Sequence, residues 1–163
     1  MLIQDFVQVD CPCSQVCSAI EADPRALLAA IADAAYREGE QLCLTLTPSL
    51  SHKSIGKQVQ VDVGHAYRLG DRLILPIQWW ATGAPALFPR LEGDIEVAPL
   101  GPERTEITLM GRYDPPLAVL GRQLDRLLLH RVAEACVRSF LTRLGASVGC
   151  AVKPMLATGR AID

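Results

Sequence analysis

The sequence predicts an α+β fold in which a curved antiparallel β-sheet packs against one long C-terminal helix. Between residues 57 and 113, runs of alternating apolar and polar residues are separated by short turns with glycine or proline, as in a meander. This pattern ends at Asp114-Pro115-Pro116, and a proline-free stretch from Leu117 to Leu144 follows with apolar residues at helical spacing. A helix in that place is expected to lie across the concave face of the sheet, which favours an apolar pocket between them.

The N-terminal part is expected to form one strand and two helices before the meander. Residues 3–9 alternate as in a strand, and residues 10–14 combine short capping side chains with a proline tolerated in a first helical turn. A helix is therefore expected to end at about Ala22. Asp23-Pro24 repeats the start signal and opens a second helix that ends near Gly39. From Gln41 to Thr47 the period changes to two, which predicts a strand.

The meander is expected to contain four further strands, which makes six in total. One face of each clear strand is apolar and the other is charged, as in a sheet covered on one side. The expected inner face of the last two strands consists of Leu91, Gly93, Ile95, Val97, Thr105, Ile107, Leu109, Gly111 and Tyr113. The four strands are expected at Lys57 to Arg68, Arg72 to Thr82, Phe88 to Ala98, and Thr105 to Tyr113.

The length of 163 residues predicts a single domain, expected at residues 1–147, followed by an extended or partly ordered tail at 148–163. Half of the residues are hydrophobic, and 16 Lys+Arg against 18 Asp+Glu give a net charge of -2. This balance argues against a nucleic-acid partner. No apolar run reaches the roughly 20 residues of a transmembrane helix, and the N-terminus lacks the basic region of a signal peptide. A cytoplasmic protein is expected.

Six cysteines in such a chain are expected to be reduced thiols. Cys11, Cys13 and Cys17 lie close together and could hold a soft metal if Cys43 or His52 supplied a fourth ligand. Structural zinc sites usually combine two pairs of ligands, and no second cysteine pair with that spacing occurs here. The favoured interpretation is that these cysteines pack as small apolar residues. Neither a metal nor another cofactor is expected.

The order of the elements resembles the helix-grip fold of the START-like superfamily, also called SRPBCC. The residues that carry the resemblance are Val7 to Pro12 at the first strand, Leu87 to Gly93 in the meander, and Gly111 to Pro116 before the last helix. Members include lipid-transfer domains, birch-pollen-allergen-like proteins and polyketide cyclase/dehydrase-like proteins. The resemblance implies a cavity between sheet and helix for an apolar or aromatic molecule. It carries over no catalytic residue, because the family's enzymes use pocket residues that vary among subfamilies.

The facing of the predicted elements gives a candidate set of cavity-lining residues. Arg131 and Arg138 fall within the apolar stripe of the long helix, where guanidinium groups are costly to bury. They could hold an acidic head group of the ligand, or they could pair with Glu134 at the rim, and the second alternative is favoured. The candidate lining comprises Leu91, Ile95, Ile107, Leu109, Tyr113, Leu124, Leu128, Arg131 and Ala135.

The leading functional hypothesis is binding of a hydrophobic lipid, polyketide or aromatic compound, with no catalytic residue assigned. One alternative is a polyketide aromatase/cyclase-like enzyme that uses His65, Tyr67 or Tyr113 as proton donors. A second alternative is an interaction module with a filled cavity. In that case an exposed indole of Trp79 or Trp80 could mark a homodimer contact. His130, off the apolar stripe of the long helix, is expected at the surface.

Overall fold

The computed structural model describes residues 2–46, 59–81, 90–114, 126–148 and 152–153, with the side chains of 39–46, 81, 114, 126–129 and 152–153 excepted. The elements follow in the order β1 (Leu2–Val9), α1 (Cys13–Ala22), α2 (Pro24–Leu46), β2 (Val59–Val63), β3 (Tyr67–Leu69), β4 (Arg72–Ala81), β5 (Arg90–Gly101), β6 (Arg104–Asp114), α3 (Arg126–Ser147) and β7 (Val152–Lys153).

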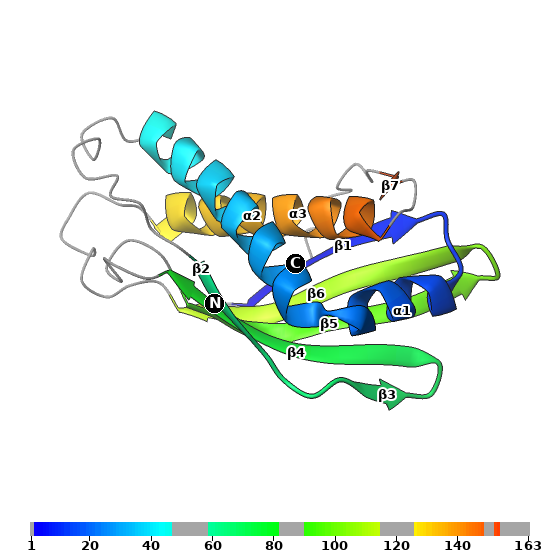
Figure 1. The fold of residues 1–163 in the computed structure, drawn as a ribbon. Coiled ribbons are helices and arrows are strands. Elements are labelled where there is room, and N and C mark those ends of the chain that lie inside the picture. The colour runs from blue at the N-terminus through cyan, green and yellow to red at the C-terminus, as the bar shows by residue number, and fades with distance from the viewer. Residues whose placement is uncertain (1, 47–58, 82–89, 115–125, 149–151, 154–163) are drawn as a thin grey trace.

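One antiparallel sheet forms the base of the molecule, and the three helices lie on one side of it (Figure 1). The strand order is β2-β4-β5-β6-β1-β7, and β3 pairs with β4 next to β2. Helix α3 contacts β1 and β6, while α2 crosses α3 and reaches β2. The α+β architecture, a curved sheet gripped by a C-terminal helix after two helices that follow the first strand, is therefore confirmed.

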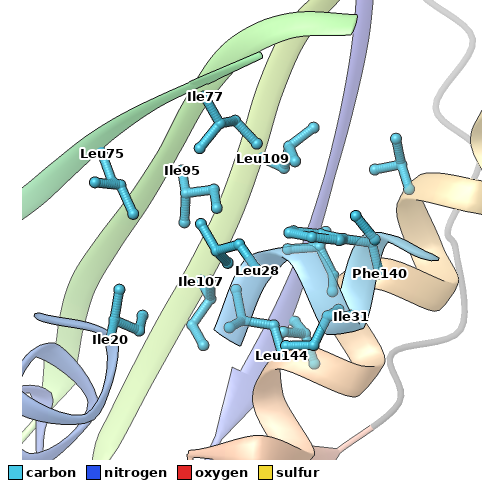
Figure 2. Close-up of a cluster of buried hydrophobic side chains, with 14 of the residues drawn as sticks. Ile20, Leu28, Ile31, Leu75, Ile77, Ile95, Ile107, Leu109, Phe140 and Leu144 are labelled. Carbon is cyan, nitrogen blue, oxygen red and sulfur yellow. The ribbon is translucent and has the colours of Figure 1, made fainter. Parts of the chain in front are cut away.

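The core lies between the sheet and the helices, and it contains the side chains that the period-two pattern assigns to the inner face. On β5, Leu91, Ile95 and Val97 are buried, while the charged residues between them are exposed or half-buried. On β6 the same alternation buries Ile107 and Leu109. Figure 2 shows Ile95, Ile107 and Leu109 from these strands in one cluster with side chains from all three helices, among them Ile20, Leu28, Ile31, Phe140 and Leu144.

Two predictions for the region before β4 are wrong. The expected strand at Gln41 to Thr47 is the continuation of α2, which ends at Leu46, while Thr47 itself lies outside the described residues. Periodicity alone cannot assign so short an apolar run to a strand or a helix, and without a proline the preceding helix continues through it. The expected strand from Lys57 to Arg68 is two strands, β2 and β3. They are separated at Gly64, whose N–H donates to the Pro76 carbonyl at 2.8 Å.

Helix α3 presents a different face to the sheet from the predicted one. The buried face carries Val132, Ala133, Val137, Phe140, Leu141 and Leu144. The predicted stripe takes its phase from Leu117, Leu120 and Leu124, which lie outside the described residues. Within α3 the largest apolar side chains decide the orientation, because burying them removes the most apolar area from water. Arg131 and Arg138 are consequently exposed, as the snorkelling alternative requires.

The strand expected at residues 41–47 is lost and the one expected at 57–68 is divided into β2 and β3, so six strands precede the C-terminal segment, which adds β7 as a seventh. In β7, Val152 and Lys153 pair with Val9 and Gln8 at the edge of the sheet. Val148, directly after α3, is buried.

The cysteines do not all have the expected state. Cys11 is disulfide-bonded, so the prediction of six reduced thiols is wrong at this position. Disulfides persist chiefly in oxidising compartments, so this bond is not what a cytoplasmic location predicts. Cys13 and Cys17 are free thiols with their sulfur atoms 3.8 Å apart.

Across the described parts of the chain, no three histidine, cysteine or acidic residues gather as a metal site would require. Two of the ligands considered from the sequence, Cys43 and His52, fall among the side chains that are not described. Among the described helices, none is both long and apolar enough to cross a membrane.

Candidate ligand pocket

An apolar pocket lies where α2 and α3 cross over the sheet. Three strands form its floor with side chains in one row, since Trp79 pairs with Leu91 and Leu91 pairs with Tyr113. The enclosed volume is about 40 Å³, and the pocket together with its mouth open to solvent measures about 550 Å³. The lining consists of Ala32, Ala35, Tyr36, Val59, Trp79, Leu91, Tyr113, Val132, Ala133, Cys136 and Val137.

The pocket exists because small residues occupy the facing sides of the two helices. Ala32 and Ala35 on α2 and Ala133 on α3 are buried there. Their methyl groups leave space that a leucine at the same position would fill. Since residues three and four apart share one face of a helix, the spacing of these alanines places them beside the larger core residues of the same face.

Two aromatic side chains from different elements partly cover the pocket. Tyr36 of α2 and Trp79 of β4 are half-buried, while Tyr113 of β6 is fully buried. The Trp79 ring packs edge-on against Phe140 of α3, with ring centroids 4.9 Å apart and planes at 61°. This edge-to-face contact places the indole beside the pocket.

Tyr113, which lines the pocket, belongs to a small polar cluster. The hydroxyl of Tyr113 lies 3.3 Å from Nδ1 of His130, and Nε2 of His130 lies 3.2 Å from Oε1 of Glu134. The tyrosine and histidine rings are roughly parallel, with centroids 6.1 Å apart. Burial, and to a smaller extent the charge of Glu134, raises the pKa of Tyr113. The phenol therefore keeps its proton at neutral pH.

His130 links the interior to the surface, so the prediction that it lies at the surface is only partly right. Its side chain is 33% exposed, compared with 52% for Glu134 and none for Tyr113. The pattern of the long helix alone did not reveal this position, because the contact depends on where α3 crosses β6.

The predicted lining residues divide into three groups. Leu91 and Tyr113 line the pocket. Ile95, Ile107 and Leu109 are buried in the core and do not line it. Arg131 and Ala135 lie along a separate groove on the outer side of α3. Leu124 lies outside the described residues, as does the side chain of Leu128.

Two arginines of the outer groove, Arg138 and Arg143, pair with carboxylates at the surface. The rim alternative paired Arg138 with Glu134. In the structure, Nε of Arg138 instead donates to Oδ2 of Asp5 on β1 at 3.1 Å. Arg143 and Ser139 both donate to Glu38 of α2. These two donors hold the pKa of Glu38 below its usual range. This outer network joins α2 and α3 without reaching the interior pocket.

Sequence reasoning missed the contribution of α2 to the pocket. Ala32, Ala35 and Tyr36 line it, although no lining residue was predicted from this helix. The available signal was the apolar face of α2, on which Leu28, Ile31 and Ala35 recur at helical spacing. What the sequence did not give is the crossing of α2 over α3 that brings this face to the same space.

Three other aromatic or titratable residues lie away from the pocket. Trp80 points to the opposite side of the sheet from Trp79, and the guanidinium of Arg90 covers its ring at 5.7 Å from the centroid. His65 and Tyr67 are exposed near the β3 edge, so they are not joined with Tyr113.

Comparisons with known proteins agree with this architecture. No protein-family model matches the sequence, and no curated protein matches it. Among solved structures, a conserved protein from Geobacillus kaustophilus is 13% identical, with 93% of this chain and 99% of that chain covered and a TM-score of 0.53. The chain has the helix-grip fold.

Two further solved structures cover a similar share of this chain and have lower TM-scores. A protein from Thermus thermophilus is 18% identical, with 91% of this chain and 97% of that chain covered and a TM-score of 0.47. The Zhui aromatase/cyclase from a Streptomyces species is 13% identical, with 91% of this chain and 93% of that chain covered and a TM-score of 0.45. In this helix-grip chain the pocket lies between sheet and C-terminal helix, with α2 as its third wall.

Proposed function

We propose that this protein binds a small hydrophobic molecule in the pocket between α2, α3 and the sheet. The observation that carries the proposal is the lining itself, which is apolar on all sides and includes three aromatic side chains, Tyr36, Trp79 and Tyr113. Ligand sites typically combine such walls with a few polar groups that set orientation. Here the polar group is the hydroxyl of Tyr113, backed by His130.

The size of the pocket sets the class of ligand. An enclosed volume of about 40 Å³ is well below the roughly 300–1,000 Å³ of drug-sized sites. A ligand with one aromatic ring or a short alkyl group fits this proposal if the two half-buried side chains, Tyr36 and Trp79, move outward on binding. Each Å² of apolar surface removed from water would contribute about 25 cal/mol.

Fluorescence of Trp79 provides a direct test. The chain has two tryptophans, so Trp80→Phe leaves Trp79 as the sole indole. 4-Nitroanisole, a neutral single-ring compound that quenches tryptophan, is expected to quench this variant along a saturable curve. Adding Ala35→Leu fills the pocket and is expected to weaken the affinity at least tenfold.

The matched control is Ala146→Leu, which makes the same change at an exposed position of α3. It is expected to leave the affinity unchanged. Quenching that rises linearly with concentration, equally in all three proteins, would show that the ring does not enter the pocket. That result would favour the interaction module with a filled cavity. Native mass spectrometry of the protein as purified from cells, before and after organic extraction, would give the mass of any resident ligand.

A second candidate function is acid–base catalysis on the bound molecule, as in the aromatase/cyclase-like alternative. The observation that favours it is the contact of Tyr113, a pocket residue, with His130. Of the three proton donors considered from the sequence, only Tyr113 lines the pocket; His65 and Tyr67 do not.

A further inference from the structure

The contacts of His130 define the direction of hydrogen bonding between Tyr113 and Glu134. An ionised carboxylate only accepts hydrogen bonds, so the Nε2–H of His130 donates to Glu134 at 3.2 Å. A neutral imidazole with its proton on Nε2 has an acceptor at Nδ1. The hydroxyl of Tyr113 therefore donates to Nδ1 at 3.3 Å. In this arrangement the tyrosine oxygen meets a ligand as a hydrogen-bond acceptor.

The three residues also connect two environments. Tyr113 is fully buried and lines the apolar pocket, whereas Glu134 is half-exposed in the outer groove of α3. His130 and Glu134 lie four residues apart on one face of the helix, which keeps the carboxylate behind the imidazole. A carboxylate in that position orients the imidazole and stabilises the imidazolium.

We propose that Tyr113, His130 and Glu134 form a proton relay that deprotonates an acidic hydroxyl, a phenol or an enol, on the ligand of the pocket. The proposal rests on the pocket being a binding site, as proposed above. The O–H bond of the ligand breaks as an O–H bond forms on Tyr113, and the original proton of Tyr113 moves to Nδ1 of His130. The net change is a ligand oxyanion and an imidazolium paired with Glu134, so no co-reactant is required.

The relay explains a feature that simple apolar binding does not. A fully buried tyrosine in a pocket can be satisfied by any acceptor, yet here the acceptor is an imidazole that itself contacts a carboxylate. The raised pKa of Tyr113 keeps the phenol protonated, so it has a proton to pass to His130 while it receives one from the ligand. Glu134 is a positioning residue, since it acts through His130.

The test compares 4-nitrophenol with 4-nitroanisole, its methyl ether, which has the same ring and no acidic proton. At a pH where free 4-nitrophenol is mainly protonated, the wild-type protein is expected to shift the bound ligand to its yellow phenolate form. Tyr113→Phe keeps the ring and is expected to weaken 4-nitrophenol binding about tenfold, as for a hydrogen bond to a charged group. The affinity for 4-nitroanisole is expected to stay within twofold.

Two further variants separate proton transfer from packing. His130→Gln keeps a polar side chain that cannot take up a proton, and it is expected to abolish the phenolate absorbance of the bound ligand. Glu134→Gln is expected to reduce the phenolate fraction severalfold without changing the affinity for 4-nitroanisole. A purely structural role of these residues would leave the spectrum of the bound ligand unchanged.

The outcomes distinguish this inference from the proposed function. If both compounds bind equally, 4-nitrophenol remains protonated and Tyr113→Phe has no effect, the relay is refuted while the pocket stands. If neither compound binds the wild-type protein, the proposed binding function fails, and the relay fails with it.

Discussion

Replacing Gly93 with alanine tests whether the close approach of β5 and β6 at a pair of glycines constrains the fold. Gly93 on β5 pairs directly with Gly111 on β6. A Cβ at Gly93 would lie 2.3 Å from the carbonyl oxygen of Met110 and 2.5 Å from Cα of Gly111. Real Cβ atoms essentially never come closer than 3.0 Å, so the strands must separate locally by at least 0.7 Å, the difference between 3.0 and 2.3 Å.

The obstructing atoms belong to the backbone, so no rotamer change can relieve the contact. Overpacking a core costs about 1–3 kcal/mol, and we expect Gly93→Ala to lower the free energy of unfolding by about 3 kcal/mol. The measurement is urea unfolding followed by circular dichroism, with the slope of the transition checked against wild type. The Leu91–Tyr113 pair lies two positions along the register from Gly93–Gly111, so fluorescence of Trp79, which pairs with Leu91, is expected to change as well.

The matched control is Gly101→Ala at the end of β5. A Cβ there meets nothing within 4 Å, so its effect is expected to stay within about 0.5 kcal/mol. If the two variants differ by less than about 1 kcal/mol, the close approach of β5 and β6 at the glycine pair does not constrain the fold, and the argument from the Cβ contacts is wrong.

Two further predictions concern the buried polar groups near α1. Burial, with the neighbouring thiol of Cys13, raises the pKa of Cys17 from 9.0 to about 11. The unfolded chain therefore ionises first, and stability that is fully present below about pH 9 is lost as the pH rises to about 11, by at most about 3 kcal/mol. Cys17→Ala is expected to flatten this part of the pH profile of the unfolding free energy, and a slope identical to wild type would contradict it. Thr105→Val removes the fully buried hydroxyl that donates to the Cys11 carbonyl at 2.8 Å, which is expected to cost about 1–3 kcal/mol in urea unfolding. Thr142→Val, which loses an exposed hydroxyl bond of the same length, is the control expected to change little.

The sequence by itself predicted the fold class and the inner faces of the central strands. Alternation with a period of two depends only on which side chains point to one side, and β5 and β6 follow it from Leu91 to Tyr113. The prolines after Asp114 and the short turns also gave the order of the last strands and the long helix. This order is what made the resemblance to helix-grip proteins recognisable.

The tertiary structure alone decided where α2 ends, which face α3 presents and what the pocket contains. The run from Gln41 to Leu46 fits a strand or a helix equally well in sequence, and it continues α2. The orientation of α3 depends on the burial of Phe140 and Leu144 against the sheet, so Arg131 lies outside and His130 meets Tyr113. Such contacts join residues far apart in the chain, and local periodicity contains no information about the crossing of two elements that brings them together.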